Sequence, residues 1–371
     1  MKVKNMPVES FTEYVQGKDV YIYGVGDFYM RLIKKVVYKD IHSSVVGYMD
    51  NGKAGEKINV FGHEYDIHNI EYLKNVKKGI VLLCGTKYLD EMYNQLMRLN
   101  LSDEIECLMM PLIWIASDGR DDKEVLEQLQ DIGNVQRYSG NGIEKKIHCF
   151  WFSGEEKPDK YQRCIDTWKR VCPDYEIIEW NADTYDWKKS VFMKQAFESR
   201  KWAFVSDYAR LDVVYNHGGI YLDMDVELIK DFEPILQFDA FFNYGTRHLI
   251  ELGSGFGARK ENAFIGRLLD RYKDIEFWDG DGKPQIDKYV QPVWLNEEYY
   301  KEGFRMDGSM QLLNNMLILP RRFYTPKDDI FLYNSLQCED TRGIHHFNSE
   351  WKPQEYLEKR DTESLCLRFV K

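Results

Sequence analysis

The 371-residue sequence lacks the features that mark secreted and membrane-spanning proteins. Its seven cysteines are an odd number and no two have the CxxC spacing, so we expect the reduced thiols of a cytosolic protein. The opening MKVKNMPVES is not followed by the apolar core of a signal peptide. Every apolar run is far shorter than the roughly 20 residues that a membrane helix needs. These absences predict a cytoplasmic protein with no transmembrane segment and leave peripheral contact with the inner face of a membrane open.

Positively charged residues are also outnumbered by acidic ones. The chain has 50 lysines and arginines against 61 acidic residues, and its net charge of −11 argues against a nucleic-acid partner. An anionic substrate would then need a local device, such as a metal ion or a helix N-terminus. Aromatic residues, by contrast, reach 15%, which suits large cores and also the binding of flat rings and sugars. Internal repeats and low-complexity tracts are absent, and the length allows two domains; the oligomeric state stays open.

The first part of the chain alternates strand-like and helical segments. Short apolar runs that predict strands are separated by stretches with helical spacing of apolar residues. The strands are expected at 20–26, 44–51, 79–85 and 104–111, and the helices at 28–38 and 89–100. This alternation predicts a small Rossmann-like parallel sheet over residues 1–135. A polar stretch rich in glycine, asparagine and serine follows, which we interpret as a linker over 136–144.

A second α/β domain is expected over residues 145–371. It begins with a predicted strand at 145–154, a helix at 157–173 that ends at a proline, and another strand at 175–182. Helical sequence over 194–219 ends at Gly218-Gly219, because glycine best tolerates the backbone conformation at a helix C-terminus. We expect the strand IYLDMDVEL (220–228) to start directly after this pair.

Two aspartates, Asp223 and Asp225, interrupt the apolar run of that strand. Side chains at i and i+2 of an extended strand point to one face, where two carboxylates repel each other unless a cation lies beside them. Oxygen ligands suit Mg²⁺ or Mn²⁺, which take their remaining ligands from water and substrate phosphates. The pair therefore indicates a metal-bound diphosphate site, although a solvated turn would also carry such residues.

The preceding helix carries a second polar group. Asp207 and Arg210 are three residues apart and share a helical face, with Ser206 beside them. Arg210 could hold Asp207 in place or reach a phosphate or a sugar hydroxyl. The alternative is a surface ion pair, which would contribute only a few tenths of a kcal/mol.

Together, the S-D-x-x-R and G-G-x-Y-x-D-x-D segments resemble the DXD-containing sugar transferases of glycosyltransferase family 32, to which the catalytic domains of clostridial glucosylating toxins are similar at a greater distance. The segments IHCFWFSG (147–154) and GIHHFNSEW (343–351) resemble the start and end of the same region. The resemblance covers roughly residues 145–352. It implies a GT-A fold, a nucleotide-sugar donor, Mn²⁺ or Mg²⁺, and retention of anomeric configuration.

The resemblance also assigns roles to single residues. It implies metal ligation by Asp225 and Asp223 with help from Ser349, and a place beside the leaving phosphate for Trp351. Asp207 and Arg210 would grip sugar hydroxyls. Either His345 or His346 would lie on the metal side, with His346 taken as the donor-site candidate. Donor contacts are implied for Trp151, as the platform for the base, and for Ser206 and Tyr221. Gln291 stands where the family usually has glycine, which leaves the role of its segment open.

The N-terminal part resembles the nucleotide-binding N-terminal domains of bacterial amino-sugar acetyltransferases. It carries Gly24-x-Gly26-x-x-Tyr29, with tyrosine where a dinucleotide fingerprint needs glycine or alanine, and Asp50 at the position of a ribose-binding acid. A structural or regulatory module, a nucleotide-binding module and an NAD-dependent activity all stay open.

The sequence thus predicts a metal-dependent retaining glycosyltransferase. Its donor would be a nucleotide sugar, with a UDP-sugar favoured, and its acceptor a saccharide or a lipid-linked saccharide in capsular or surface polysaccharide synthesis. The alternatives are a GDP-mannose-type mannosyltransferase and a non-catalytic sensor of sugar nucleotides. A glycosidase is disfavoured, because its two carboxylates must lie about 5 Å or more apart on opposite sides of the scissile bond.

Overall fold

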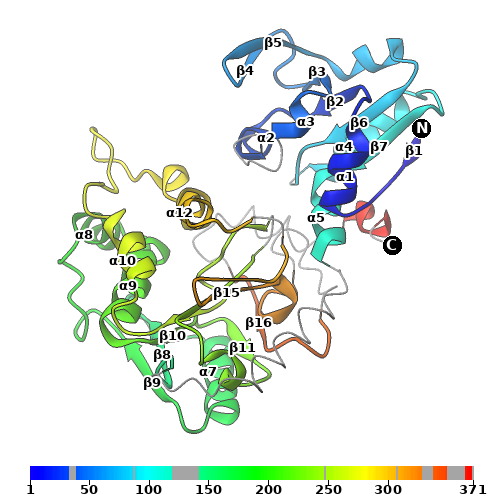
Figure 1. Cartoon of the computed structure of the whole chain (residues 1–371). Coiled ribbons are helices and arrows are strands. Elements are labelled where there is room, and N and C mark those ends of the chain that lie inside the picture. Colours follow the sequence, from blue (N-terminus) through cyan, green and yellow to red (C-terminus); the bar gives the residue numbers. More distant parts are fainter. Residues whose placement is uncertain are drawn as a thin grey trace. The chain divides into compact units, whose positions relative to one another are not determined.

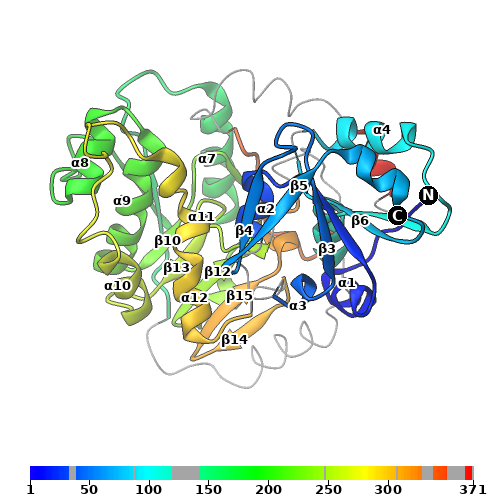
Figure 2. The same ribbon diagram turned by 90° about the horizontal axis from the view of Figure 1, so that it is seen from above.

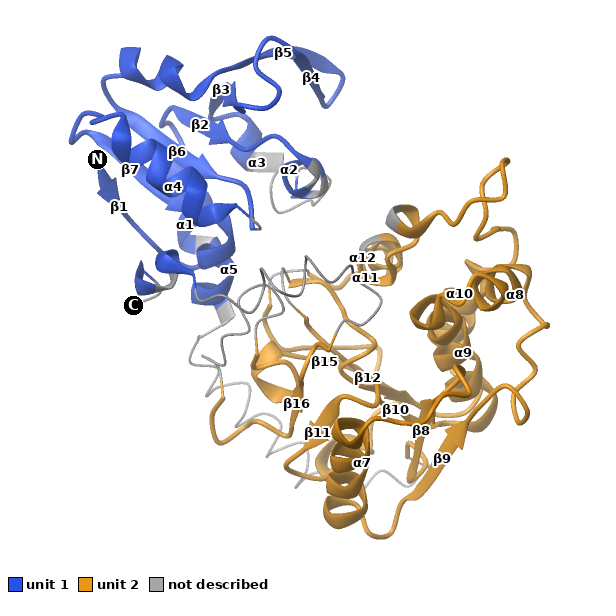
Figure 3. Ribbon diagram, turned by 180° about the vertical axis from the view of Figure 1, so that it is seen from behind, with its two compact units in different colours: residues 1–120, 330–332, 355–371 blue, residues 121–329, 333–354 orange. Residues whose placement is uncertain are grey.

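The computed structural model describes residues 1–32, 39–86, 88–118, 142–245, 248–305, 308–327, 337–348 and 364–369 (Figure 1). The chain divides into two compact units (Figure 3). Unit 1 comprises Met1–Arg120, Ile330–Leu332 and Glu355–Lys371, and unit 2 comprises Asp121–Asp329 and Tyr333–Gln354. Most of the expected linker, residues 136–141, lies outside the described residues. Among the described residues, no helix combines the length and the apolar character needed to cross a bilayer.

Unit 1 is built on a seven-stranded sheet in the order β1-β7-β6-β2-β3-β5-β4, in which only the β4–β5 pair is antiparallel. The predicted parallel α/β arrangement is thus confirmed. The strands are β1 (Lys2–Val3), β2 (Val20–Tyr23), β3 (Val45–Met49), β4 (Lys57–Val60), β5 (His63–His68), β6 (Gly79–Leu83) and β7 (Ile105–Met109). The helices are α1 (Val8–Val15), α2 (Asp27–Leu32), α3 (Lys39–His42), the 3₁₀ helix η2 (Ile70–Asn75), α4 (Leu89–Arg98) and α5 (Met110–Asp118).

Each face of this sheet has its own hydrophobic cluster, because successive side chains of a strand point to opposite faces. Val20 and Ile22 of β2 belong to the cluster that includes residues of α1 and α5. Tyr23 belongs to the other cluster, which includes residues of α4. Figure 2 shows α1 and α4 on opposite sides of the sheet. The alternation of strands and helices in the sequence therefore produces a three-layered unit.

The C-terminal segment packs on unit 1. The 3₁₀ helix η7 (Leu365–Phe369) contacts α4, and the Cys366 side chain is fully buried. Asp90, in the first turn of α4, accepts hydrogen bonds from the Ser364 hydroxyl (2.6 Å) and from the backbone N–H groups of Leu365 (2.9 Å) and Cys366 (3.2 Å). The sequence-based division placed this segment in the second domain, and these contacts assign it to the first unit instead.

Unit 2 has a mixed seven-stranded sheet in the order β14-β15-β12-β13-β10-β8-β9 and a separate antiparallel pair, β11-β16. Strands β9, β8 and β10 are parallel to one another, and β13 runs antiparallel to β10. The main strands are β8 (Lys146–Phe150), β9 (Glu176–Trp180), β10 (Gly219–Tyr221), β12 (Ala240–Asn243), β13 (Phe256–Ala258), β14 (Gln311–Leu313) and β15 (Met316–Leu319). The pair consists of β11 (Val226–Leu228) and β16 (Gly343–His345).

Helices cover both faces of this sheet. One hydrophobic cluster joins the sheet to residues of α8, α9 and α10, and a second joins it to residues of α7 and β11. The helices are α7 (Asp159–Val171), α8 (Val191–Glu198), α9 (Trp202–His217), α10 (Ala263–Asp270), α11 (Gln291–Trp294) and α12 (Asn296–Glu302), with short 3₁₀ helices η3 (Glu233–Ile235), η5 (Ile286–Lys288) and η6 (Arg321–Phe323). The expected second α/β unit is confirmed as a fold class.

The end of α9 prepares the strand that follows it. The helix ends at His217, and Gly218 and Gly219 have φ of +66° and +100°, as the sequence predicted for this pair. The neutral ring of His148 accepts from the Trp180 indole N–H at Nδ1 (3.2 Å) and donates from Nε2 to the Gly218 carbonyl (2.9 Å). Its burial lowers the pKa of His148 to about 4, so it remains neutral. This contact joins the helix end to β8 and β9.

The expected continuous strand over 220–228 is wrong. β10 ends at Tyr221, β11 begins at Val226, and the four residues between them form a turn closed by the bond from the Val226 N–H to the Asp223 carbonyl (3.0 Å). The break has a clear cause, since β10 pairs with β8 and β13 in the main sheet whereas β11 pairs with β16. Both aspartates of the DXD motif therefore lie in the turn where the chain changes sheets.

Candidate active site

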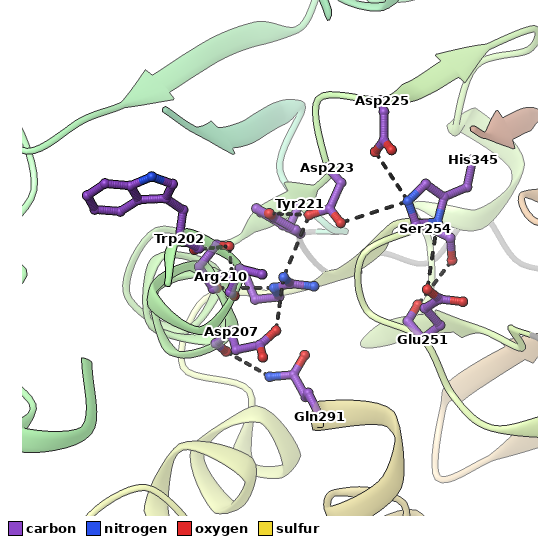
Figure 4. Close-up of polar contacts among 12 residues, drawn as sticks. Trp202, Asp207, Arg210, Tyr221, Asp223, Asp225, Glu251, Ser254, Gln291 and His345 are labelled. Atoms are coloured by element: carbon purple, nitrogen blue, oxygen red, sulfur yellow. Dashed lines mark hydrogen bonds and ion pairs between the residues drawn. The ribbon is translucent and has the colours of Figure 1, made fainter. Parts of the chain in front are cut away.

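Three side chains meet at the turn between β10 and β11. Nε2 of His345 lies 3.2 Å from Oδ1 of Asp225 and 3.9 Å from Oδ2 of Asp223 (Figure 4). The antiparallel pairing of β11 with β16 sets His345 opposite Val226, directly after Asp225. The backbone N–H of Asn348 donates to Oδ2 of Asp225 (2.8 Å), which fixes this carboxylate from the other side.

The chemistry of these three groups fits a divalent ion. One ligand atom from each of Asp223, Asp225 and His345 lies within 4.8 Å of the others. Two carboxylates and an imidazole are ligands for Mn²⁺ or Mg²⁺ and for other first-row divalent ions. Asp225 and His345 are buried and Asp223 is half-buried, so the group is shielded but has an exposed side. The residues could therefore hold the metal expected from the sequence.

The same contacts set the charges of the metal-free site. Burial opposes ionisation of Asp225, but the neighbouring His345 and the N–H of Asn348 outweigh it and lower the pKa of Asp225 to about 2. Burial likewise opposes protonation of His345, yet Asp225, with Glu251 and Asp223 further away, raises the pKa of His345 to about 9. At neutral pH an imidazolium cation thus lies where a bound metal ion would place its own positive charge.

Arg210 connects the α9 motif with the DXD motif. Its Nη2 lies 3.0 Å from Oδ1 of Asp207 and 3.7 Å from Oδ1 of Asp223, and its guanidinium lies over the Tyr221 ring. The Tyr221 hydroxyl donates to the same Asp223 oxygen (2.5 Å). The expected pair of Asp207 and Arg210 therefore exists, but it is buried and extends to Asp223, so it differs from a surface ion pair. Tyr221 supports Asp223 from within the core.

Asp207 is held from two sides. Burial raises the pKa of Asp207 to about 7, although Arg210 acts in the opposite direction. The amide of Gln291, at the start of α11, donates to the Asp207 carbonyl (2.8 Å) and to the Tyr272 hydroxyl (2.8 Å). Gln291 therefore has a structural function at the position where the family usually has glycine: it connects α11 with α9.

Several of the predicted site residues lie away from this cluster or are bonded to other groups of the same chain. Nε2 of His346 lies 3.1 Å from Oε2 of Glu227 and away from the two aspartates, so His345 is the histidine of the cluster. The Ser206 hydroxyl donates to carbonyls of its own helix. Trp151 is half-buried, its indole N–H donates to the Glu155 carbonyl (2.7 Å), and its ring lies 5.5 Å from that of Tyr161. Ser349 and Trp351 lie outside the described residues.

Sequence reasoning missed Gly253, which lies directly against the site. A Cβ at this position would lie 2.4 Å from Oδ2 of Asp223 and 3.4 Å from Nη1 of Arg210. The Gly253 carbonyl also accepts the backbone N–H of Asp223 (3.0 Å). The only sequence signal for this position is the run of small residues in GSGFGA (253–258).

In unit 1, the groups considered for nucleotide binding contact other residues of the same unit. Oδ2 of Asp50 accepts from the Val25 N–H (3.1 Å), and Tyr29 is buried 5.9 Å from the Tyr48 ring. Gly24 has φ +97°, and a Cβ there would lie 2.8 Å from both the Cys84 carbonyl and the Met92 side chain. These contacts favour the structural interpretation of this loop.

Comparison with known proteins supports the assignment of unit 2. Residues 158–242 match the family described as "Glycosyltransferase sugar-binding region containing DXD motif". Inositol phosphoceramide mannosyltransferase 1 of Schizosaccharomyces pombe is 22% identical over 234 residues, covering 60% of this chain and 66% of that protein. Inositol phosphoceramide mannosyltransferase 3 of the same yeast is 29% identical over 133 residues. The match covers 32% of this chain and 35% of that protein.

Human alpha-1,4-N-acetylglucosaminyltransferase is 24% identical over 160 residues. The match covers 42% of this chain and 41% of that protein. The chain thus spans less than two thirds of the length of these relatives. Among solved structures, the match to one titled "PaToxG Glycosyltransferase" covers 49% of this chain and 77% of the chain in that structure, with 19% identity and a TM-score of 0.36. The match over residues 158–242 confirms the resemblance to DXD-containing glycosyltransferases seen in the sequence.

Proposed function

We propose that unit 2 transfers a sugar from a nucleoside-diphosphate sugar to a saccharide acceptor in a reaction that depends on a divalent ion. The observation that carries the proposal is the convergence of Asp223, Asp225 and His345 within 4.8 Å, at the DXD motif of the matched family. A divalent ion held there would supply positive charge to the two phosphates of the leaving nucleotide.

The chain's own residues prepare this site before substrate binds. Asp225 is oriented by the Asn348 N–H, and Asp223 is oriented by the Tyr221 hydroxyl and Arg210. Such fixed groups cost little reorganisation when charge develops on the leaving phosphate. Asp207 and Arg210 remain our candidates for contacts with sugar hydroxyls, and Arg210 also supports Asp223. The acceptor hydroxyl attacks the anomeric carbon with retention, and its proton passes to the leaving phosphate.

For the donor, we favour a UDP-sugar, with the half-buried Trp151 as the platform for the base. A GDP-mannose donor is the second candidate, because two of the relatives are named mannosyltransferases. The acceptor would be a saccharide or a lipid-linked saccharide in capsular or surface polysaccharide synthesis, reached from the cytoplasm or the inner face of the membrane. A thermal-shift panel of UDP- and GDP-sugars with Mn²⁺ separates the donors, since only the true donor should raise the melting temperature in a metal-dependent way.

The decisive experiment measures donor hydrolysis and transfer with and without Mn²⁺ or Mg²⁺. We expect metal-dependent release of the nucleoside diphosphate by the wild-type protein and its loss in Asp225→Asn, which keeps the size of the side chain. Asp166→Asn on the exposed face of α7 is the matched control and should behave as wild type. Full activity of Asp225→Asn would refute the metal assignment. Tight donor binding without turnover would instead favour the non-catalytic sensor.

A further inference from the structure

Each of the two ring nitrogens of His345 has a carboxylate near it. Nε2 faces the aspartates of the DXD turn, and Nδ1 lies 3.8 Å from Oε1 of Glu251 (Figure 4). Nδ1 is buried and has no hydrogen-bond partner among the described residues. The Phe347 ring lies 4.1 Å from the imidazole ring, which leaves the ring little freedom to turn away. Glu251 is therefore the carboxylate next to the ring nitrogen that points away from the cluster.

The backbone of Glu251 is firmly held. Its N–H donates to the Asn243 carbonyl (3.0 Å), and its carbonyl accepts the hydroxyl of the fully buried Ser254 (3.0 Å). Its side chain occupies space that a glycine leaves free, because a Cβ on Gly245 would lie 2.2 Å from Oε2 of Glu251. The fixed backbone and the space left by Gly245 thus allow this carboxylate to lie beside the histidine.

A histidine that ligates a metal through one nitrogen commonly donates the other N–H to a carboxylate. That partner fixes the tautomer and the ring orientation and makes the ligand more basic. In His345, a proton on Nδ1 facing Glu251 leaves the Nε2 lone pair directed at Asp223 and Asp225. The 3.8 Å separation is longer than a hydrogen bond, and a movement of about 1 Å by either side chain would complete one.

We propose that Glu251 is a positioning residue for the metal site, which orients His345 through Nδ1 so that Nε2 can ligate the ion. This inference rests on the proposed function, because it requires that Asp223, Asp225 and His345 bind a divalent ion. Glu251 itself lies on the other side of the imidazole from the two aspartates and is not a ligand.

The test measures the affinity of the full chain for Mn²⁺ by electron paramagnetic resonance, without any donor or acceptor. We expect Glu251→Ala to bind Mn²⁺ roughly 10- to 100-fold more weakly than the wild type. Glu251→Gln should lie between the two, since its amide oxygen can still accept the Nδ1 proton but carries no charge. A graded loss of this kind follows from orientation of the histidine and would not result from a general loss of packing.

Two further variants sharpen the test. Gly245→Ala should reduce Mn²⁺ affinity in the same direction as Glu251→Ala, because the added methyl group displaces the carboxylate without removing it. Glu227→Gln is the matched control, since Glu227 forms the equivalent contact with His346 beside the cluster, and its Mn²⁺ affinity should equal that of the wild type.

The outcomes separate this inference from the proposed function. If the wild type binds Mn²⁺, Asp225→Asn loses it, and both Glu251 variants bind as tightly as the wild type, the positioning role is refuted and the metal site stands. If Glu227→Gln weakens binding as much as Glu251→Gln, the effect is general electrostatics and the inference is also refuted. If the wild type itself does not bind Mn²⁺, the metal assignment in the proposed function fails.

Discussion

Arg210 lies 3.7 Å from Asp223, and through this contact the helix motif and the DXD motif form one connected group. The same guanidinium nitrogen lies 3.0 Å from Asp207. A single cation therefore balances two carboxylates in a protein interior, where an unpaired charge is costly. This relationship joins two motifs that are separated along the sequence into one charge network.

The first prediction concerns this cation. Arg210→Met removes the charge and keeps much of the side-chain volume, so it leaves Asp207 and Asp223 without their partner. We expect the free energy of unfolding to fall by about 3–5 kcal/mol, measured by urea denaturation, together with loss of transferase activity. Arg210→Lys should recover part of the stability and little activity, because an ammonium group cannot reproduce the guanidinium fork.

Arg267→Met provides the control for Arg210, since Arg267 pairs with Glu302 at a partly exposed position. This substitution should lower the free energy of unfolding by less than about 1 kcal/mol. A comparably small effect of Arg210→Met would show that the buried group is not coupled to folding as the distances imply.

The second prediction uses the glycine that lies against Asp223. In Gly253→Ala the new methyl group would meet Oδ2 of Asp223 at 2.4 Å, so the carboxylate must move. We expect metal-dependent turnover to fall at least tenfold and the Mn²⁺ concentration for half-maximal rate to rise, as measured from initial rates at varied Mn²⁺. Gly280→Ala adds the same methyl group in open space and should have wild-type kinetics. Equal rates for the two variants would contradict the assigned position of Asp223.

The third prediction concerns pH. The pKa of His345 is raised to about 9 in the metal-free protein, so a metal ion must displace a proton from Nε2 at neutral pH. Metal affinity should therefore rise as pH rises toward 9, by up to about tenfold per pH unit. Isothermal titration with Mg²⁺ at several pH values measures this slope. His345→Gln removes the proton and should show a flatter profile; an equally steep one would assign the proton to another group.

The same raised pKa affects stability with the opposite sign. His345 binds its proton more tightly in the folded than in the unfolded state. It therefore contributes stability that is fully present below the ordinary histidine pKa of about 6.5 and is lost as pH rises through about 9. Denaturation of the metal-free protein across this range should reveal the loss, and His345→Gln should not show it.

The fourth prediction concerns the C-terminal segment on unit 1. Asp90 accepts bonds from Ser364, Leu365 and Cys366, and these bonds outweigh its burial and lower the pKa of Asp90. Its stabilising contribution is thus present at neutral pH and lost as pH falls through the lowered pKa. At neutral pH, Asp90→Ala should cost about 1–3 kcal/mol in unfolding free energy and expose the C-terminus to limited proteolysis. Asp103→Asn, at a highly exposed position, should change neither measurement.

Much of the fold followed from local sequence patterns. The end of α9 at Gly218-Gly219 and the contact between Asp207 and Arg210 depend on residues a few positions apart, which helical geometry places together. The prediction of a continuous strand over 220–228 was wrong because its apolar residues are equally compatible with two short strands. Only the separate pairing of β10 and β11 distinguishes these arrangements, and it involves strands far along the chain.

The choice between two adjacent histidines illustrates the remaining limit. Side chains of neighbouring residues along a strand point to opposite faces, so the sequence HH states only that one of them can face the metal site. The register of β16 on β11 directs His345 to the aspartates and leaves His346 with Glu227. Glu251 and Gly253 come from a loop between β12 and β13, where no local spacing relates them to Asp223 or His345.

The sequence by itself determined the α/β class, the end of α9 and the resemblance of residues 158–242 to DXD-containing glycosyltransferases, because each depends on composition or on spacing within a few residues. The tertiary structure alone decided that His345 completes the cluster and that Gly253 and Glu251 surround it. It also decided that the C-terminal segment packs on unit 1. The physical reason is that these contacts depend on strand register and on burial, and both arise only when distant segments of the chain pack together.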